Sequence, residues 1–595
     1  MKSPRRSLIV LGLVSVLLVS AETNAQKGKL KGFDAFATRV MKEWKVPGMA
    51  VAVIEDGQVT LAKGYGYRDV ENKQPVTSKT LFAIGSVTKS MTATVLGMLS
   101  DEGKIDWDKP VQEILPEFRL HDEVATRQMT PRDLVTHRSG LPRHDLMWYG
   151  AAFTREELFN RLRYIEPSHP FRTTFQYQNL MFMTAGYLAC HVAGTTWEDL
   201  VREKIFQPLD MIRSNFSVDD MQKSDDFALP YAVLEDDVIK IPYRNIDEIG
   251  PAGSVNSCVE EMIRYVDFHI NKGKHGDEQL LSETMAQQMQ MPQMPMTGTI
   301  RYEELGHNSY GMGLFITTYR GHVLIHHGGG IDGFISLLSF MPQKKIGAMI
   351  LTNMSGNNPV PTIISRNLYD RLLGLDPIDW VGRIKEQEEE NETAEADAED
   401  DEYSDRKEGT TPSHDLTDYA GQYEHPGYGI VTVKLADEAL TLSFNSFHSP
   451  LQHYHYDIYE IPESPMDPLE ELKVTFFYNK KGDIDRLAIP LESNVNDIVF
   501  QRVVDESLSQ KDVLVQFVGQ YELGSTTITV ALRGEDTLTL TVPGQPTYTL
   551  VPTREMNFDL KGMNGFSVEF KKDTHGEIVE VVFYQPNGTF VAKKT

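Results

Sequence analysis

The chain has 595 residues and a formal net charge of −27 at pH 7. A chain of this length is too long for one hydrophobic core, so several domains are expected. Apolar residues make up 41% of it and charged residues 24%, which is typical of soluble globular proteins. The negative charge disfavours nucleic acids and anionic membrane surfaces as partners, because both repel an acidic protein.

The N-terminal residues have the pattern of an export signal. Lys2, Arg5 and Arg6 form a basic start, and an apolar run covers residues 8–19. That run is too short for a membrane span of about 20 helical residues. We therefore expect residues 1–25 to be a cleaved signal peptide and the protein to be periplasmic or secreted. An uncleaved membrane anchor is the alternative, and no other segment has the composition of a membrane span.

The cysteine usage is sparse. Cys190 and Cys258 are the only two cysteines, and Cys190 stands in an apolar helical pattern typical of a small core residue. A disulfide between them is an open alternative in an exported protein, because the sequence does not fix their separation. No Cys and His spacing typical of a zinc site occurs.

Residues 30–380 mix strand and helix patterns. An Asp56-Gly57 turn joins the first two strand patterns, and an apolar helix is predicted over residues 90–99, ending near Gly103. Strands at both ends of the segment with helices between them favour an α+β domain whose sheet joins the chain ends. The predicted strands cover residues 49–54, 59–66, 324–327, 334–340 and 346–351.

Residues 381–412 differ in composition from their neighbours. Runs of Glu and Asp at 386–390 and 399–402 dominate a stretch with almost no large apolar side chains. Such a stretch cannot bury a core, so a disordered, extended acidic linker is expected. Weak binding of calcium or of a basic partner is the alternative.

Two similar segments follow the acidic stretch. Gly421-Gln422-Tyr423-Glu424 recurs at residues 519–522, and Leu440-Thr441-Leu442 recurs at residues 538–540. Both segments alternate apolar and polar residues in short runs that end at Gly, Asp and Asn. The pattern predicts an internal duplication into two all-β, barrel-like domains, at residues 413–505 and 511–595. Neither copy contains an evident catalytic constellation.

The first candidate for chemistry is Ser86-Val87-Thr88-Lys89. A Ser and a Lys three residues apart lie on the same side of a helix. If the amine is buried and neutral, it can accept the hydroxyl proton and turn Ser86 into a nucleophile. By itself the spacing has a structural alternative, which is a Ser near a helix start beside a solvated Lys.

The second candidate is Tyr177-Gln178-Asn179. The phenol of Tyr177 would exchange a proton with Ser86 or a leaving group if neighbouring positive charge lowered its pKa from about 10. The Asn179 amide would bind a substrate carbonyl and orient Lys89. The structural alternative is a buried aromatic residue beside an Asn in a turn.

The third candidate is the run His326-His327-Gly328-Gly329-Gly330. A strand that enters a glycine run allows another backbone to approach closely. Exposed N–H groups there can form half of an oxyanion hole, with the N–H of Ser86 as the other half. A flexible turn with a structural His is one alternative. A metal site on the paired histidines is another, but no carboxylate or third His is spaced to complete it.

In this order, Ser-x-x-Lys, Tyr-x-Asn and His-x-Gly resemble the active-site motifs of the serine β-lactamase and penicillin-binding-protein superfamily. The likeness covers residues 30–375 and is strongest to the class C β-lactamase-like hydrolases, which include D-aminopeptidases, D-alanyl carboxypeptidases and esterases. It implies an α+β catalytic domain with an antiparallel sheet and a helical region. Family-like stretches at residues 46–53, 134–141, 206–211 and 310–313 support it.

The resemblance implies a role for each motif residue. Ser86 would be the acylated nucleophile and Lys89 its proton acceptor. Tyr177 would act as general base or acid, and Asn179 would orient the substrate and Lys89. The backbone N–H groups of Ser86 and of the Gly329-Gly330 pair, Gly330 above all, would bind the oxyanion. No metal or organic cofactor is implied.

The third motif departs from the family, which usually has Lys-Thr-Gly where this chain has His327-Gly328-Gly329. His327 can be neutral at pH 7, and Gly328 has no hydroxyl. Losing one charge-assisted hydrogen bond would cost about 1.5–3 kcal/mol of carboxylate recognition. We therefore expect a D-aminopeptidase- or esterase-like hydrolase of small peptides or esters. The alternatives are β-lactamase or D-alanyl-D-alanine carboxypeptidase activity, or a catalytically weak sensor.

Overall fold

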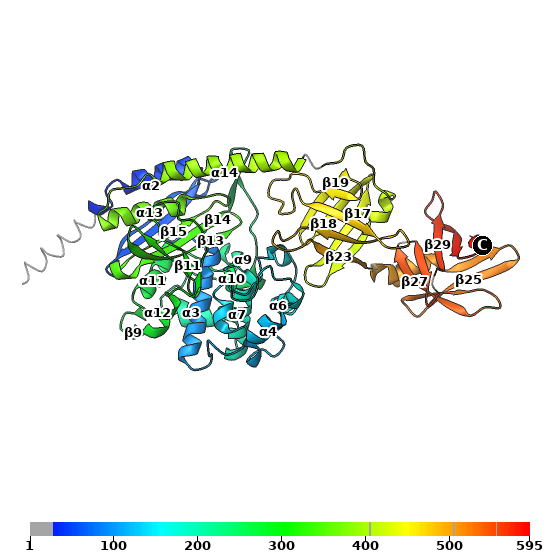
Figure 1. Ribbon diagram of the computed structural model, residues 1–595, viewed down its shortest axis with the longest axis horizontal. Helices are drawn as coiled ribbons and strands as arrows, with labels where there is room; N and C mark the ends of the chain where they lie inside the picture. Colours follow the sequence, from blue (N-terminus) through cyan, green and yellow to red (C-terminus); the bar gives the residue numbers. More distant parts are fainter. Residues whose placement is uncertain (1–27, 404–405, 504–505, 555, 564) are drawn as a thin grey trace, which may run out of the picture. The chain divides into compact units, whose positions relative to one another are not determined.

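The computed structural model describes residues 28–403, 406–503, 506–554, 556–563 and 565–595 (Figure 1). The predicted signal peptide, residues 1–25, lies outside the described residues. The chain divides into two compact units. The first comprises the described residues up to 403 together with Glu492–Val495, and the second comprises Arg406–Leu491 and Asn496–Thr595.

The first unit is built around one antiparallel sheet. Within residues 28–403 this sheet has nine strands in the order β10-β11-β12-β13-β14-β15-β1-β2-β3, so strands from both ends of the segment pair at its centre. This confirms the predicted α+β class and the predicted strands. The strands are β1 (Gly48–Glu55), β2 (Gln58–Asp69), β3 (Gln74–Pro75), β10 (Met294–Pro295), β11 (Ser309–Tyr310), β12 (Phe315–Tyr319), β13 (His322–Ile331), β14 (Phe334–Met341) and β15 (Ile346–Thr352).

The turn between β1 and β2 lies at Asp56-Gly57, as predicted. Both residues have positive φ, 48° and 74°, which is the left-handed conformation that a tight hairpin turn requires. Every residue of β1 is buried, because helices cover both faces of the sheet.

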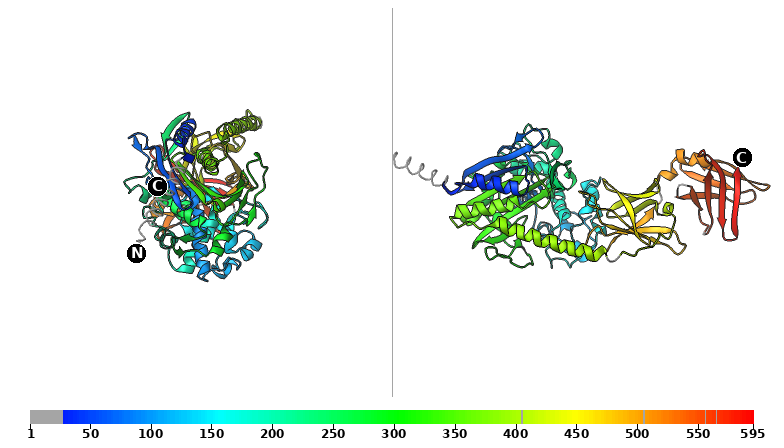
Figure 2. Two further views of the ribbon diagram at one scale, coloured as in Figure 1. Left: turned by 90° about the vertical axis from the view of Figure 1, so that its left-hand side faces the viewer. Right: turned by 90° about the horizontal axis from the view of Figure 1, so that it is seen from above.

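Helices α2 (Phe33–Glu43) and α13 (Val360–Leu373) cover one face of the sheet, and α11 (Val259–Ile270) covers the other (Figures 1 and 2). Met49, Val51 and Val53 of β1 share a core with α2 and α13. On the opposite face, Gly347 allows close approach, because a Cβ there would lie 2.4 Å from a methyl group of Val266. The sheet is therefore the central layer of three.

A helical region lies beside the sheet and positions the first motif. α3 (Thr88–Asp101) is buried from Thr88 to Leu99 and packs against α7 (Asn179–Ala193) and α10 (Gly250–Gly253). Gly103, with φ of 72°, follows its end, as predicted. The other helices of the unit include α4 (Glu123–Gln128), α5 (Pro131–Leu134), α6 (Arg155–Arg161), α8 (Trp197–Val201), α9 (Val218–Met221) and α12 (Glu283–Met289).

The acidic segment is helical, which contradicts the predicted disordered linker over most of its length. α14 runs from Trp380 to Tyr403. Glu, Ala and Lys have high helix propensity, so the composition that prevents a core still permits a helix. The N-terminal part of α14 is also anchored, since Trp380 and Val381 are buried in the core and Glu388 accepts a hydrogen bond of 3.1 Å from Trp44 Nε1.

The second unit contains two closed antiparallel barrels, each with eight strands in its described residues, which confirms the predicted barrel-like domains. The first barrel has β16 (Gly421–His425), β17 (Gly429–Ala436), β18 (Ala439–Phe444), β19 (Phe447–His455), β20 (Ile458–Glu460), β21 (Lys473–Tyr478), β22 (Ile484–Ile489) and β23 (Ile498–Val503). The second has β24 (Gly519–Leu523), β25 (Thr526–Arg533), β26 (Thr537–Thr541), β27 (Thr547–Arg554), β28 (Asn557–Leu560), β29 (Ser567–Lys572), β30 (Ile578–Gln585) and β31 (Gly588–Lys594).

The two barrels share structural details as well as sequence motifs. The repeated Gly-Gln-Tyr-Glu opens β16 in one barrel and β24 in the other. Tyr423 and Tyr521 are both fully buried, and each donates a hydrogen bond of 2.8 Å to the carbonyl four residues earlier, of Tyr419 and Phe517 respectively. The equivalent strands and hydrogen bonds confirm the internal duplication.

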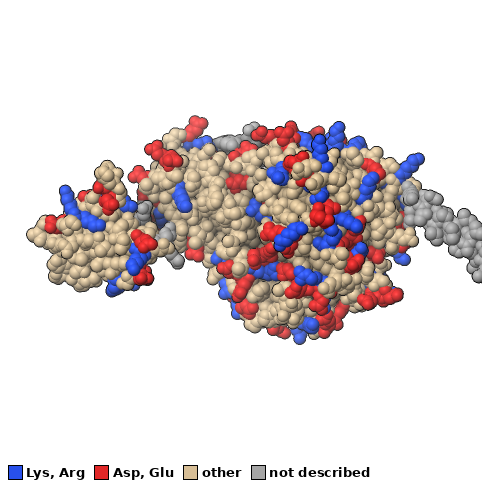
Figure 3. All heavy atoms as spheres, turned by 180° about the vertical axis from the view of Figure 1, so that it is seen from behind, with Lys and Arg blue, Asp and Glu red and all other residues tan. Residues whose placement is uncertain are grey.

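Three further observations concern the cysteines, membrane-spanning helices and surface charge. Cys190 and Cys258 are free thiols, so the disulfide left open by the sequence is not formed. Among the residues that the structure describes, no helix combines the length and the apolar character needed to cross a membrane. On the face displayed in Figure 3, acidic and basic side chains are interspersed over the first unit.

Candidate active site

Ser86 lies in a tight turn that leads into α3. The 3-10 turn Gly85–Val87 carries it, and Lys89 is the second residue of the helix that follows. The Nζ of Lys89 and the Oγ of Ser86 lie 2.9 Å apart, as the spacing predicted. Gly85 has a φ of 50°, and a Cβ on it would lie 2.7 Å from the nitrogen of Gly330. A side chain at position 85 would therefore separate the two segments.

Lys89 is completely buried, and no carboxylate among the described residues forms an ion pair with its amine. Nζ donates hydrogen bonds of 2.7 Å to Asn179 Oδ1 and of 2.7 Å to the carbonyl of Ala252. Burial lowers the pKa of Lys89 well below its ordinary value, and the positive charge of Arg143 lowers it further. A neutral amine has two N–H groups and one lone pair. The two acceptors use both N–H groups, which leaves the lone pair for the Ser86 hydroxyl.

Tyr177 lies beside this pair, just before α7. Lys89 Nζ is 4.9 Å from the centre of its ring, and the Arg143 guanidinium is 5.2 Å from it. Burial raises the pKa of Tyr177 well above 10, and this outweighs the hydrogen bond with Ser86 and the charge of Arg143. The condition set for an easily ionised phenol, a pKa lowered overall by neighbouring positive charge, is therefore not met. The phenol is protonated at neutral pH.

Asn179 links Lys89 to an ion pair that the sequence reasoning missed. Its Nδ2 donates a hydrogen bond of 2.9 Å to Asp145 Oδ1, while its Oδ1 accepts from Lys89. Arg143 Nε lies 2.5 Å from the other oxygen of Asp145. Arg143 and Asp145 come just after the family-like stretch at residues 134–141. Their closeness to that stretch was the only sequence feature that could have pointed to them. The ion pair fixes the orientation of the Asn179 amide.

His327 is buried and neutral. Its Nδ1 lies 2.6 Å from the carbonyl of Gly328, which only accepts, so Nδ1 carries the hydrogen. Its Nε2 therefore accepts from the hydroxyl of Tyr310 at 3.0 Å. Burial, together with the nearby Lys89, lowers the pKa of His327 to about 3. The position that holds a Lys in the family has neither a cation nor a free donor here.

The glycine run is part of a strand and not a flexible turn. β13 continues through Gly328–Gly330 to Ile331 and pairs with β14 from Ile325 to Ile331. A Cβ on Gly329 would lie 1.9 Å from the carbonyl oxygen of Ile84, so only glycine allows the strand to lie against the turn that carries Ser86. Gly330 is exposed next to that turn. Its N–H is thereby placed close to the segment of Ser86.

His137 packs against the second motif. It was not singled out from the sequence. Its ring lies 4.2 Å from that of Tyr177, centre to centre, and its Nδ1 accepts a hydrogen bond of 3.0 Å from the backbone N–H of Gln178. Burial lowers the pKa of His137 well below its ordinary value. This neutral ring holds Tyr177 in place.

The metal site on paired histidines is contradicted by the geometry. His326 and His327 are neighbours on β13, and successive residues of a strand point to opposite faces of its sheet. Within the described residues no group of three or more His, Cys, Asp or Glu side chains is placed to share a metal ion.

Comparisons with known proteins agree with this fold. Among curated relatives, the unguisins hydrolase ungD′ of Aspergillus campestris is 29% identical over 431 residues, which cover 69% of this chain and 79% of that protein. The protein flp of Staphylococcus aureus is 22% identical over 336 residues, which cover 56% of this chain and 64% of flp.

A solved structure shares the fold. The octameric penicillin-binding protein homologue from Pyrococcus abyssi has a TM-score of 0.52 and 24% sequence identity, over 80% of this chain and 99% of its own. A family described as a domain of unknown function (DUF3471) matches residues 405–502, the region of the first barrel. The family described as Beta-lactamase matches residues 33–371, which include all three motifs and more than half of the chain. The chain therefore belongs to the β-lactamase family.

Proposed function

We propose that the protein is an exported serine hydrolase that cleaves small peptides or esters through an acyl-enzyme on Ser86. One observation carries this proposal. A completely buried Lys89, whose pKa is lowered well below its ordinary value, has its Nζ 2.9 Å from the Ser86 hydroxyl. A neutral amine at that distance is a general base for a serine nucleophile. Export rests on the pattern of the N-terminal residues.

Acylation begins with transfer of the Ser86 proton to Lys89. The Oγ then forms a bond to the carbonyl carbon of the substrate, and negative charge develops on the carbonyl oxygen. The backbone N–H groups of Ser86 and Gly330 donate to that oxygen. The carbonyl of Ala252 and Asn179 Oδ1 already accept from Lys89 in the unliganded protein, so they also stabilise its ammonium form.

Tyr177 supplies the proton for the leaving group. Because its phenol is protonated at neutral pH, it acts first as an acid. The bond to the leaving amine or alcohol breaks as the phenol proton is transferred, and Lys89 returns a proton to Tyr177. Water then attacks the acyl carbonyl, the bond to Oγ breaks, and the proton of water returns to Ser86 through Lys89. The products are an acid and an amine or alcohol.

The third motif favours substrates without an essential carboxylate. His327 is neutral and both of its ring nitrogens have partners, and Gly328 lacks a hydroxyl. This supports D-aminopeptidase- or esterase-like activity over that of a β-lactamase or a D-alanyl-D-alanine carboxypeptidase. A relative that is named a hydrolase supports hydrolysis in general.

A substrate panel tests the proposal. It contains D- and L-aminoacyl amides, short-chain esters and a chromogenic cephalosporin, each offered to the wild type and to Ser86→Ala. We expect turnover of amides or esters by the wild type, lost in the variant and much faster than turnover of the cephalosporin. Preferred turnover of the cephalosporin would overturn the substrate assignment, and equal turnover by Ser86→Ala would overturn the nucleophile.

A further inference from the structure

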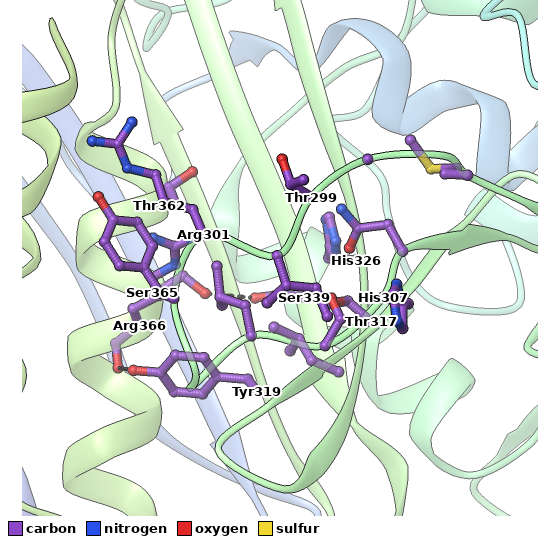
Figure 4. A pocket seen from close by; sticks show the side chains of 18 of the residues that line it. Thr299, Arg301, His307, Thr317, Tyr319, His326, Ser339, Thr362, Ser365 and Arg366 are labelled. Atoms are coloured by element: carbon purple, nitrogen blue, oxygen red, sulfur yellow. Dashed lines mark hydrogen bonds between the residues drawn. The ribbon is translucent and has the colours of Figure 1, made fainter. Parts of the chain in front are cut away.

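A cavity lies on the face of the sheet opposite His327. It has a volume of about 370 Å³ and is lined by residues of β12–β14, α13, α14 and the segment 296–308 (Figure 4). His326 and Ser339 are register partners on β13 and β14 and both line it, while His327 faces Tyr310 on the other side of β13. The cavity is therefore separated from Ser86 by the sheet.

Arg366 of α13 brings an uncompensated positive charge to this cavity. Its guanidinium lies 4.0 Å from the centre of the Trp380 ring, and burial lowers its pKa. Among the described residues, no carboxylate pairs with it, and its side chain makes no hydrogen bond. Two neighbouring acidic side chains already have other basic partners. Glu304 pairs with Arg383 at 2.9 Å, and Asp370 pairs with Arg320 at 2.8 Å.

A chain of hydroxyl groups ends beside Arg366. Tyr369 donates a hydrogen bond of 3.0 Å to Ser339, whose Oγ lies 3.1 Å from that of Ser365. A hydroxyl has one hydrogen and can accept two, so either oxygen of the Ser339–Ser365 pair can be the donor. Ser365 is only 3% exposed and lines the cavity, and Ser339 is its one side-chain partner among the described residues. The Ser365 hydroxyl can therefore turn to meet a ligand.

His326 adds a neutral polar group. Its ring stacks on Phe315 with centres 5.4 Å apart, and neither ring nitrogen makes a hydrogen bond within the described residues. Burial, and to a smaller degree the charge of Arg366, lower the pKa of His326 to about 4. It is therefore neutral at pH 7 and can donate one hydrogen bond into the cavity (Figure 4).

The charge and the walls define the ligand. Arg301 also lines the cavity but pairs with Glu390 at 2.8 Å, which leaves Arg366 as the guanidinium without a carboxylate partner among the described residues. That charge with two neutral donors matches one negative charge, and a planar carboxylate pairs with a guanidinium through two parallel hydrogen bonds. A doubly charged phosphate would keep a charge uncompensated. The volume is at the lower end of the range of about 300–1,000 Å³ for small-molecule sites. The remaining wall mixes polar side chains with an apolar group that can hold the body of a ligand, formed by Ile300, Leu305, Leu324, Leu337 and Ile384.

We propose that this cavity is a second ligand site, which binds a small monocarboxylate with an apolar body through Arg366, Ser365 and His326. The site is independent of the proposed hydrolytic function, because none of the catalytic side chains of the three motifs lines the cavity. It is therefore tested in Ser86→Ala, in which acylation is removed.

Calorimetry with 3-phenylpropanoate and its neutral isostere 3-phenylpropanamide tests the proposal in the full-length Ser86→Ala protein. We expect one saturable site for the acid, at least tenfold weaker binding of the amide, and weaker binding of inorganic phosphate. Adding Arg366→Met should weaken binding of the acid at least tenfold, and Ser365→Ala should weaken it several-fold. Arg371→Met is the control on the same helix, because Arg371 does not line the cavity.

Two results would overturn the second site. One is equal affinity for the acid and the amide, which would show that the negative charge of the ligand does not contribute to binding. The other is unchanged binding of the acid in both Arg366→Met and Ser365→Ala, which would place the acid elsewhere on the protein. The milder Ser365→Ala variant keeps the test valid if Arg366→Met, which loses its contact with Trp380, folds poorly.

Discussion

The chemistry at the residue scale depends on keeping the Lys89 amine neutral. The side chain is fully buried, and Asp145 acts on it only at a distance, through Asn179. Since the folded-state pKa lies below the ordinary 10.5, the unfolded chain binds a proton that the folded chain does not, at any pH between the two values. Folding stability due to Lys89 therefore falls as the pH is lowered through that window.

The same shift predicts the pH dependence of acylation. The rate should rise with pH through a single ionisation that lies well below 10.5, because only the neutral amine accepts the Ser86 proton. The pH profile of kcat/KM for a neutral ester measures this. A rate that stays constant until pH 10 and rises only there would mean that Lys89 is an ordinary, solvated lysine.

A second prediction concerns the missing cation of the third motif. His327→Lys should raise kcat/KM for a carboxylate-bearing ester relative to a matched neutral ester by about tenfold or more, from a charge-assisted bond of roughly 1.5–3 kcal/mol. His322→Lys, on the same strand, controls for the added charge. An unchanged ratio in His327→Lys would refute the selectivity argument.

The sequence predicted the side chains of the three motifs but not the surroundings that tune them. Lys89 contacts both Ser86 and Asn179, as the spacing and the family resemblance suggested. Ala252 contributes a backbone carbonyl, which leaves no side-chain signal. The direction of the pKa shift of Tyr177 was left conditional on neighbouring charge, because it depends on burial, and burial is a tertiary property.

At the scale of elements, the site depends on the contact between β13 and the turn of Ser86. Gly329→Ala should reduce kcat/KM at least a hundredfold, because its Cβ would lie 1.9 Å from the Ile84 carbonyl and push the strand away from Ser86. Gly328→Ala is the matched control, since a Cβ there meets only one atom, 3.7 Å away. Comparable losses of kcat/KM in both variants would show that activity does not depend on the close approach of Gly329 to Ile84.

The elements themselves were predictable where apolar runs and turn residues mark them. The hairpin of β1 and β2 and the buried helix α3 carry such runs and were predicted. α14 was not, because a solvated acidic helix has no apolar stripe and shares its composition with disordered segments. Its helical state depends on Trp380 and on the hydrogen bond from Trp44 to Glu388, which join residues far apart in the sequence.

At the scale of the whole molecule, the two barrels are separable from the proposed chemistry. The second barrel has its own core, which includes Phe517, Tyr521 and Phe570. All hydrogen bonds given above for the catalytic side chains lie within the first unit. The duplication was visible in the sequence because each copy repeats the same buried tyrosine at the same strand.

Removing residues 506–595 should therefore leave the hydrolysis of a small neutral ester within about twofold of the wild type. Steady-state kinetics of the shortened chain measure this, with circular dichroism as the control for folding. A well-folded shortened chain that loses its activity would show that the second barrel contributes to the site.

The most direct test of the central claim is the mass of the protein after reaction with a fluorophosphonate. We predict a single adduct that maps to Ser86 in the wild type and forms at least a thousandfold more slowly in Lys89→Met, whose side chain fills a similar apolar volume. No adduct on Ser86 in the wild type, or equal rates in Lys89→Met, would contradict a serine nucleophile activated by a buried, neutral lysine.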